Sequence, residues 1–152
     1  THEIVNAINS FPGTNRRFEK LAPGLYSDYG HHPVEIAATL QMARELSDEV
    51  VLVYQPHQNI RQHAIKDQYK DTFLQAEKVY WLPTYLSRED PELPVLSPEE
   101  LIAELANPEI AAPAELNDDL WQKITNLRSA GKLVLLMGAG GVDGWAREQL
   151  AA

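Results

Sequence analysis

The sequence contains no cysteine, and this absence excludes several kinds of site. Without a thiol the chain can form no disulfide framework, no thiolate zinc site and no cysteine nucleophile. Basic residues are also scarce: 13 Lys and Arg stand against 22 Asp and Glu, which leaves a formal charge of −9. That charge argues against a general attraction to nucleic acid or to an anionic membrane. Any anion bound by this chain has to be held by a few local basic groups.

Long apolar runs and a secretory leader are missing too. The apolar run at residues 133–137 is far shorter than the roughly 20 residues that a membrane helix needs. The sequence opens on Thr1, His2 and Glu3, without a basic region followed by an apolar stretch. We therefore expect no secretory signal, no membrane partner and a cytoplasmic location. The lack of an initiator Met predicts a fragment or a trimmed piece of a longer protein.

The composition that is present, 44% hydrophobic and 23% charged over 152 residues, is typical of one folded domain. Apolar runs at residues 50–54, 79–82 and 133–137 do not alternate with polar residues, which predicts strands buried on both faces of a parallel sheet. Segments with helical spacing of apolar residues lie at residues 34–46 and 121–128, and between them Ile65, Tyr69 and Phe73 recur every four residues and predict a further helix. This alternation predicts the α/β class with right-handed crossovers.

The first 30 residues follow a different pattern. Residues 3–10 favour a short helix, and residues 16–21 and 25–29 favour two strands joined by a turn. This hairpin is predicted to add an antiparallel edge to the sheet. Residues 87–119 contain several prolines and predict a loop-rich excursion, interrupted by one helix that Ser97 caps.

The densest group of chemically active side chains lies around the hairpin. If Asp28 ends a strand and a helix opens soon after it, the loop between them lies at the carboxyl edge of the sheet, where α/β proteins bind ligands. Arg16 and Arg17 are suited to phosphate oxygens because a guanidinium offers a planar fork of donors and keeps its charge. Asp28 would accept hydrogen bonds from a ribose or orient His31 and His32. In the alternative interpretation the arginines pair with surface carboxylates and the histidines cap the helix.

A second polar loop, residues 55–63, follows the next predicted strand. His57 and Arg61 could face the same crevice from there. His57 and His63 could join the earlier histidines around a metal ion, but no zinc-binding spacing is present. We predict no metal site.

The glycine-rich stretch at residues 138–144 follows a strand and superficially resembles a dinucleotide fingerprint. Asp143 stands where the third glycine of that fingerprint would be, and no second βαβ unit follows. The stretch therefore predicts a tight turn between a strand and a helix, which could line the same crevice.

Four strings, taken in order along nearly the whole chain, resemble the C-terminal domain of the Mur ligases, which are the ATP-dependent amide ligases of peptidoglycan precursor synthesis. The strings lie at residues 11–19, 28–36, 55–57 and 138–140, and Asp-Tyr-Gly-His-His-Pro at residues 28–33 is the most specific part. The resemblance is to the branch that joins L-alanine to UDP-N-acetylmuramate. It implies a Rossmann-like, mainly parallel sheet flanked by helices that closes over a central ATPase domain.

By this resemblance Arg17 would contact the nucleotide phosphates, and Asp28 would help to orient the nucleotide. The resemblance implies substrate contacts for His31, His32, His57 and Arg61. ATP would phosphorylate the muramyl carboxylate, and the amine of an amino acid or peptide would attack the acyl phosphate. The resemblance assigns no certain catalytic residue to this domain, because ATP and Mg²⁺ would be bound mainly by the central domain, which precedes it in the ligases.

Two departures leave alternatives open. Gln58 stands where the alanine-adding ligases usually carry a basic residue, so a related recycling ligase, which attaches a tripeptide to UDP-N-acetylmuramate, is the nearest alternative. The phosphate loop G-x-x-x-x-G-K-[ST] is absent from the sequence, so the isolated chain is expected to be inactive. A free-standing module that binds a nucleotide or precursor without catalysis is the third hypothesis.

Overall fold

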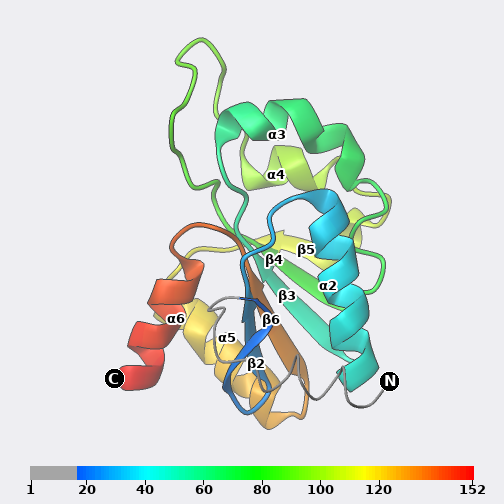
Figure 1. The fold of residues 1–152 in the computed structure, drawn as a ribbon, viewed down its shortest axis with the longest axis vertical. Coiled ribbons are helices and arrows are strands. Elements are labelled where there is room, and N and C mark those ends of the chain that lie inside the picture. Colours follow the sequence, from blue (N-terminus) through cyan, green and yellow to red (C-terminus); the bar gives the residue numbers. More distant parts are fainter. Residues whose placement is uncertain (1–16) are drawn as a thin grey trace.

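The computed structural model describes residues 17–152 and has the predicted α/β architecture (Figure 1). Six strands form one sheet in the order β1-β2-β6-β3-β4-β5. Their bounds are β1 (Glu19–Ala22), β2 (Leu25–Asp28), β3 (Val50–Tyr54), β4 (Lys78–Trp81), β5 (Ala111–Pro113) and β6 (Leu133–Met137). Strands β1 and β2 pair antiparallel, and every other pair is parallel. The mainly parallel sheet with an antiparallel hairpin at its N-terminal edge is thus confirmed.

Helices cover both faces of the sheet (Figure 1). They are α2 (Pro33–Leu46), α3 (Asn59–Ile65), the 3₁₀ turn η1 (Lys66–Tyr69), α4 (Pro98–Ile102), the 3₁₀ turn η2 (Pro108–Ile110), α5 (Asp118–Ser129) and α6 (Val142–Ala151). Apolar residues of α2, α4 and the α3–η1 segment pack on one face, and those of α5 and α6 pack on the other. Every residue of β3 and β6 is buried, because these central strands are covered from both sides.

Helix α2 shows how local sequence sets an element of the fold. Pro33 occupies the first turn, where its missing N–H is not needed. Ile36, Leu40 and Ala43 recur at helical spacing and are fully buried against the sheet. Burial of each of the two larger side chains stabilises the fold by roughly 1.5–3 kcal/mol.

Two segments differ from the sequence-based prediction. Ile65, Tyr69 and Phe73 are buried, as their spacing indicates, but they do not share one helix, because α3 ends at Ile65 and a 3₁₀ turn follows. Strand β5 was not predicted, because a three-residue strand that ends in proline carries no periodic signal. The predicted cap is confirmed, since the side chain of Ser97 accepts the N–H of Glu100.

Part of the predicted N-terminal region lies outside the described residues, namely the helix over residues 3–10 and the side chain of Arg16. Within residues 17–152, no helix is both long enough and apolar enough to cross a bilayer.

Candidate functional site

Three loops meet at one edge of the sheet because the strands before them end in register. Asp28 at the end of β2 pairs with Met137 at the end of β6, which in turn pairs with Tyr54 at the end of β3. Beyond the strands, the N–H of Gly138 donates to the carbonyl of Asp28 at 3.2 Å, and the N–H of Gln55 donates to the carbonyl of Met137 at 2.9 Å. The predicted meeting of these loops at the carboxyl edge of the sheet is therefore confirmed.

The glycine-rich turn after β6 is shaped by close contact with Gln55. Gly138 has φ of +148°, and a Cβ there would lie 2.7 Å from the carbonyl oxygen of Gln55. A Cβ at Gly140 would lie 2.6 Å from Oε1 of Gln55 and 2.7 Å from Cγ of Tyr85. The same Oε1 accepts the N–H of Val142 at 3.2 Å, so protein atoms already fill the start of α6. The turn joins a strand to a helix, as the sequence indicates.

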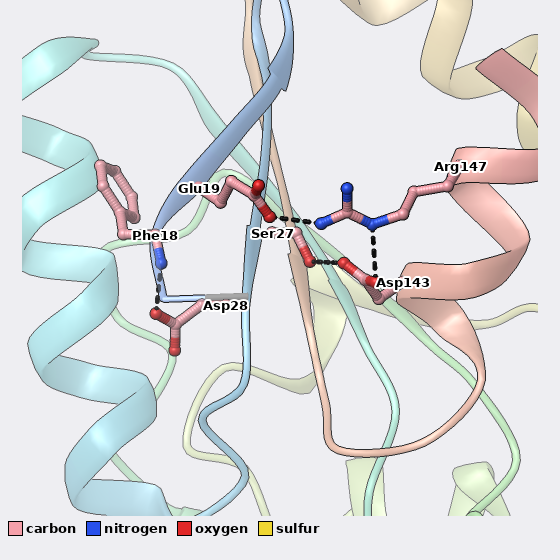
Figure 2. Close-up of polar contacts among 6 residues, drawn as sticks. All are labelled: Phe18, Glu19, Ser27, Asp28, Asp143 and Arg147. Carbon is pink, nitrogen blue, oxygen red and sulfur yellow. Dashed lines mark hydrogen bonds and ion pairs between the residues drawn. The ribbon is translucent and has the colours of Figure 1, made fainter. Parts of the chain in front are cut away.

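The site has two halves. The first, which we call the hairpin half, consists of Arg17, Phe18 and the β1–β2 hairpin, and Asp28 organises it. Its Oδ1 accepts the N–H of Phe18 at 2.8 Å, and its Oδ2 accepts the N–H of Gly30 at 2.8 Å. The first of these bonds is drawn in Figure 2. Arg17, the residue before Phe18, is exposed, and no carboxylate within residues 17–152 pairs with it. Asp28 thus fixes the backbone beside a guanidinium that is available to an anion, which suits the predicted phosphate contact.

A charged cluster joins the hairpin of β1 and β2 to α6. Its members are Glu19, Ser27, Asp143 and Arg147 (Figure 2). Ser27 Oγ donates to Asp143 Oδ1 at 2.6 Å, and Arg147 Nε donates to Asp143 Oδ2 at 2.9 Å. Arg147 also pairs with Glu19 of β1. The hydrogen bond to Asp143, together with the pair to Glu19, raises the pKa of Arg147. Sequence analysis missed this cluster, although the i,i+4 spacing of Asp143 and Arg147 was a usable signal.

The second half, which we call the histidine half, consists of the loops after β2 and β3. It brings the rings of His31 and His57 together. Their ring centroids lie 5.5 Å apart at an interplanar angle of 70°, and the ring of His57 also stacks on that of Tyr85, with centroids 5.8 Å apart. Burial lowers the pKa of His57, and the nearby His31 and the positive charge of Arg61 lower it further. The buried Nδ1 of His57 has no hydrogen-bond partner within the described part of the chain. The lowered pKa favours the neutral imidazole form of His57.

His32 has a different environment from its neighbour. Its Nδ1 accepts the N–H of Val34 at 3.3 Å, while Glu35 Oε1 accepts the N–H of His32 at 3.2 Å. These two bonds form a capping box at the start of α2. The alternative interpretation, a histidine that caps the helix, is confirmed for His32, and its contact with substrate stays a prediction.

Two further residues of the histidine half carried no signal in the sequence. Glu89 accepts the N–H groups of Ser87, Asn59 and Ile60 at 2.8–2.9 Å and so fastens its loop to α3. Desolvation raises the pKa of Glu89, but the three N–H donors outweigh it and leave the pKa lowered. Tyr85 covers the ring of His57, as described above. Tyr85 lies just before the proline-containing excursion and Glu89 lies at its start, and neither stretch has a motif that would place it here.

Gln58, the position that departs from the alanine-adding ligases, lies at the entry to α3. Its backbone has φ of +64°, a conformation that non-glycine residues rarely adopt, and its N–H donates to the carbonyl of Tyr85 at 2.8 Å. Within residues 17–152, no three or more His, Asp or Glu side chains gather closely enough to hold a metal ion.

Comparison with known proteins identifies the family of this chain. A model described as "Mur ligase, glutamate ligase domain" matches residues 16–140. The chain belongs to the Mur ligase family. UDP-N-acetylmuramate--L-alanine ligase from Jannaschia sp. (strain CCS1) is 38% identical over 95% of this chain. The match covers 32% of that protein, so the chain spans about a third of the length of the curated relatives that it matches.

Solved structures show the same fold. A murein peptide ligase from Psychrobacter arcticus 273-4 matches 96% of this chain and 31% of its own, with a TM-score of 0.68 and 25% identity. UDP-N-acetylmuramate-alanine ligase MurC from Thermotoga maritima matches 97% of this chain and 32% of its own, with a TM-score of 0.62 and 21% identity. The architecture described above is thus that of a Mur ligase C-terminal domain.

Proposed function

We propose that this chain is the closing domain of a Mur ligase that joins L-alanine to UDP-N-acetylmuramate and consumes ATP. One observation carries the proposal: a single sheet edge presents Arg17 on one side and His31, His57 and Arg61 on the other. The 38% identity to a relative with that name supports this substrate choice. The two preceding domains would supply the phosphate loop, the UDP-sugar site and Mg²⁺, so the isolated chain is inactive. Because the reaction consumes ATP, we place the enzyme in the cytoplasm.

The residues of the edge suit the chemistry. In the proposed reaction the muramyl carboxylate takes the γ-phosphoryl group of ATP, and the amine of the amino acid then displaces phosphate to form the amide. Arg17 would hold phosphate oxygens, where its guanidinium would offset developing negative charge. Asp28 would orient the nucleotide indirectly, by holding the backbone of Phe18. Arg61 would bind the carboxylate of the incoming amino acid, with the neutral ring of His57 beside it.

A second candidate is the recycling reaction, in which a ready-made tripeptide replaces L-alanine. Its supporting observations are the TM-score of 0.68 to a murein peptide ligase and the presence of Gln58 in place of a basic residue. A neutral amide at that position removes one positive charge from the substrate side. The two reactions share every step except the identity of the amine.

The deciding experiment uses the full-length protein. We expect the gene to encode a G-x-x-x-x-G-K-[ST] loop upstream of this segment, and its absence would refute the ligase assignment. The purified ligase, given ATP, Mg²⁺ and UDP-N-acetylmuramate, is then supplied with L-alanine or with the tripeptide, and the product mass is measured. A product formed only with the tripeptide would transfer the assignment to the recycling ligase.

Calorimetry separates both ligases from the third hypothesis, a free-standing binding module. A closing domain should bind an ATP analogue or UDP-N-acetylmuramate only weakly by itself, because most contacts to these ligands lie in the other domains. Tight binding of either ligand by the isolated chain would favour the module.

A further inference from the structure

A row of buried hydrogen bonds connects the backbone of His31 with that of His57. The hydroxyl of Tyr54 lies 3.2 Å from the carbonyl oxygen of His31 and 2.7 Å from the hydroxyl of Tyr69. Tyr69 donates to Oε1 of Gln62 at 2.5 Å, and Nε2 of Gln62 donates to the carbonyl oxygen of His57 at 3.2 Å. The side chains of Tyr54, Tyr69 and Gln62 are fully buried.

The direction of these bonds can be derived from the available protons. Each tyrosine has one hydroxyl hydrogen, and both ends of the row are carbonyl acceptors. Tyr69 gives its hydrogen to Gln62, so the short contact between the two hydroxyls requires Tyr54 to donate to Tyr69. Tyr54 then shares the same hydrogen with the carbonyl of His31. The donors therefore point outward from Tyr54 toward the two carbonyl ends of the row, and Tyr69 is its central link.

Stability alone does not explain a polar row in this place. The two tyrosines pack among the apolar and aromatic side chains of the core, where they contact Phe73 and Trp81. A buried polar group contributes little net stability, whereas apolar groups of the same shape would serve the core equally well. A satisfied buried network does, however, fix the relative position of the groups that it joins. Here those groups are the two loops that carry the paired histidine rings.

We propose that Tyr69 and Gln62 are positioning residues that set the spacing of His31 and His57 and, through them, the site for the amino substrate. The second half of this statement rests on the proposed ligase function. Gln62 also adjoins Arg61 on α3, so a fixed Gln62 side chain orients the helix that presents this guanidinium. None of the three row residues touches the substrate; they act through the loops.

The kinetic test uses Tyr69→Phe in the full-length ligase. This change cuts the row at its centre but leaves the Tyr54 bond to His31 and the Gln62 bond to His57 intact. We expect KM for the amino substrate to rise about 10-fold or more, while KM for ATP stays within about twofold, because small misplacements of binding groups cost up to about 100-fold. The matched control is Thr72→Val, which removes a hydroxyl that is bonded at 3.0 Å to the carbonyl of Gln68 and is not a member of the row. The control should leave both KM values unchanged.

A second readout tests the positioning in this chain by NMR, independently of any activity. In Tyr69→Phe the nuclear Overhauser contact between the rings of His31 and His57 should weaken. The pKa of His57 should also move upward toward its ordinary value of 6.5, because the neighbouring ring of His31, which lowers it, moves away; Arg61 and Glu89, the other charged groups that act on it, are not substituted. If Tyr69→Phe does not fold, Gln62→Leu replaces it and should give the same changes.

The outcomes separate the two proposals. Ring contact, histidine pKa and KM all equal to those of Thr72→Val would overturn the positioning role. A wild-type ligase that joins neither L-alanine nor the tripeptide would overturn the proposed function, yet the NMR comparison would still decide whether Tyr69 and Gln62 position the histidines.

Discussion

On the hairpin half of the candidate site, charged groups near the surface hold the chain in place. Asp143, Arg147 and Glu19 fasten β1 and β2 to α6. On the histidine half, neutral hydroxyl and amide groups with no exposed surface do the same work. The hairpin half is therefore expected to respond to salt and to loss of charge, whereas the histidine half should respond to changes of shape. In a ligase that binds phosphate at the hairpin half and an amino substrate at the histidine half, the two binding regions would thus be held in place by different kinds of contact.

The largest effect on activity is expected for Arg17, whose exposed side chain does not anchor the hairpin. Replacing Arg17 by Ala in the full-length ligase should lower kcat/KM by roughly 100- to 1000-fold, because a fixed donor to a charged transition state is lost. The midpoint of urea unfolding should not change, since the side chain is exposed. Arg17→Lys is the matched variant and should recover part of the rate. A rate equal to that of the wild type would remove Arg17 from the mechanism.

The next effect concerns the turn that joins the two halves. Gly138→Ala should reduce the free energy of unfolding by about 3 kcal/mol, because the new Cβ meets the backbone oxygen of Gln55 and the backbone is in a region unsuited to alanine. Gly141→Ala, three residues along the same turn, is the control, since a Cβ there meets nothing within 4 Å. Urea unfolding followed by circular dichroism measures both. Equal stability of the two variants would contradict the assigned packing.

The charged cluster itself should contribute less. Asp143→Ala leaves Ser27 and Arg147 without their shared acceptor, and we expect a loss of about 1.5–3 kcal/mol, as for other hydrogen bonds to charged groups. Asp119→Ala breaks an exposed i,i+4 pair with Lys123 and should cost no more than about 0.5 kcal/mol. If both variants unfold at the same urea concentration, the cluster does not anchor the hairpin.

The smallest effect is a dependence on pH at the loop that covers the histidine half. The pKa of Glu89 is lowered in the folded chain, so its carboxylate stabilises the fold at pH values above the ordinary pKa of 4.5. This contribution disappears as the pH falls through the lowered pKa. Glu89→Gln should therefore be less stable than the wild type at pH 7, and the difference should shrink as the pH falls below the ordinary pKa of 4.5. The exposed Glu115→Gln is the control; a difference between Glu89→Gln and the wild type that does not vary with pH would refute the assignment.

The fold was largely predictable because its strongest signals are local. The uninterrupted apolar runs of β3 and β6 predict buried parallel strands, and the Pro33 start of α2 was visible as well. Strand β5 was not predictable, since its place beside β4 is decided by tertiary pairing and not by its own three residues. The same limit applies to η1, where packing of Tyr69 and Phe73 overrides a helical spacing.

The candidate site was predictable only in part. The strings around His31 and His57 indicated two loops at one sheet edge, and the structure places these rings in contact. Tyr85 and Glu89 come from a loop without periodicity, so their positions follow only from the folded chain. The role of Gln62 and Tyr69 could not be predicted for another reason. Spacing does not distinguish a buried polar pair within an apolar pattern from residues that only fill the core.

Strand β6 lies between β2 and β3 in the sheet, although it is the last of the six strands in the sequence. Until residues 133–137 have been synthesised, β2 and β3 have no common neighbour in the sheet, and only side-chain contacts such as the bond from Tyr54 to His31 join the loops after them. The site is therefore the last part of the fold to take shape, through contacts of long sequence separation that close slowly. A chain that stopped before Leu133 would still contain Arg17, Arg61 and all five histidines, but it would lack the strand that sets β2 and β3 in register.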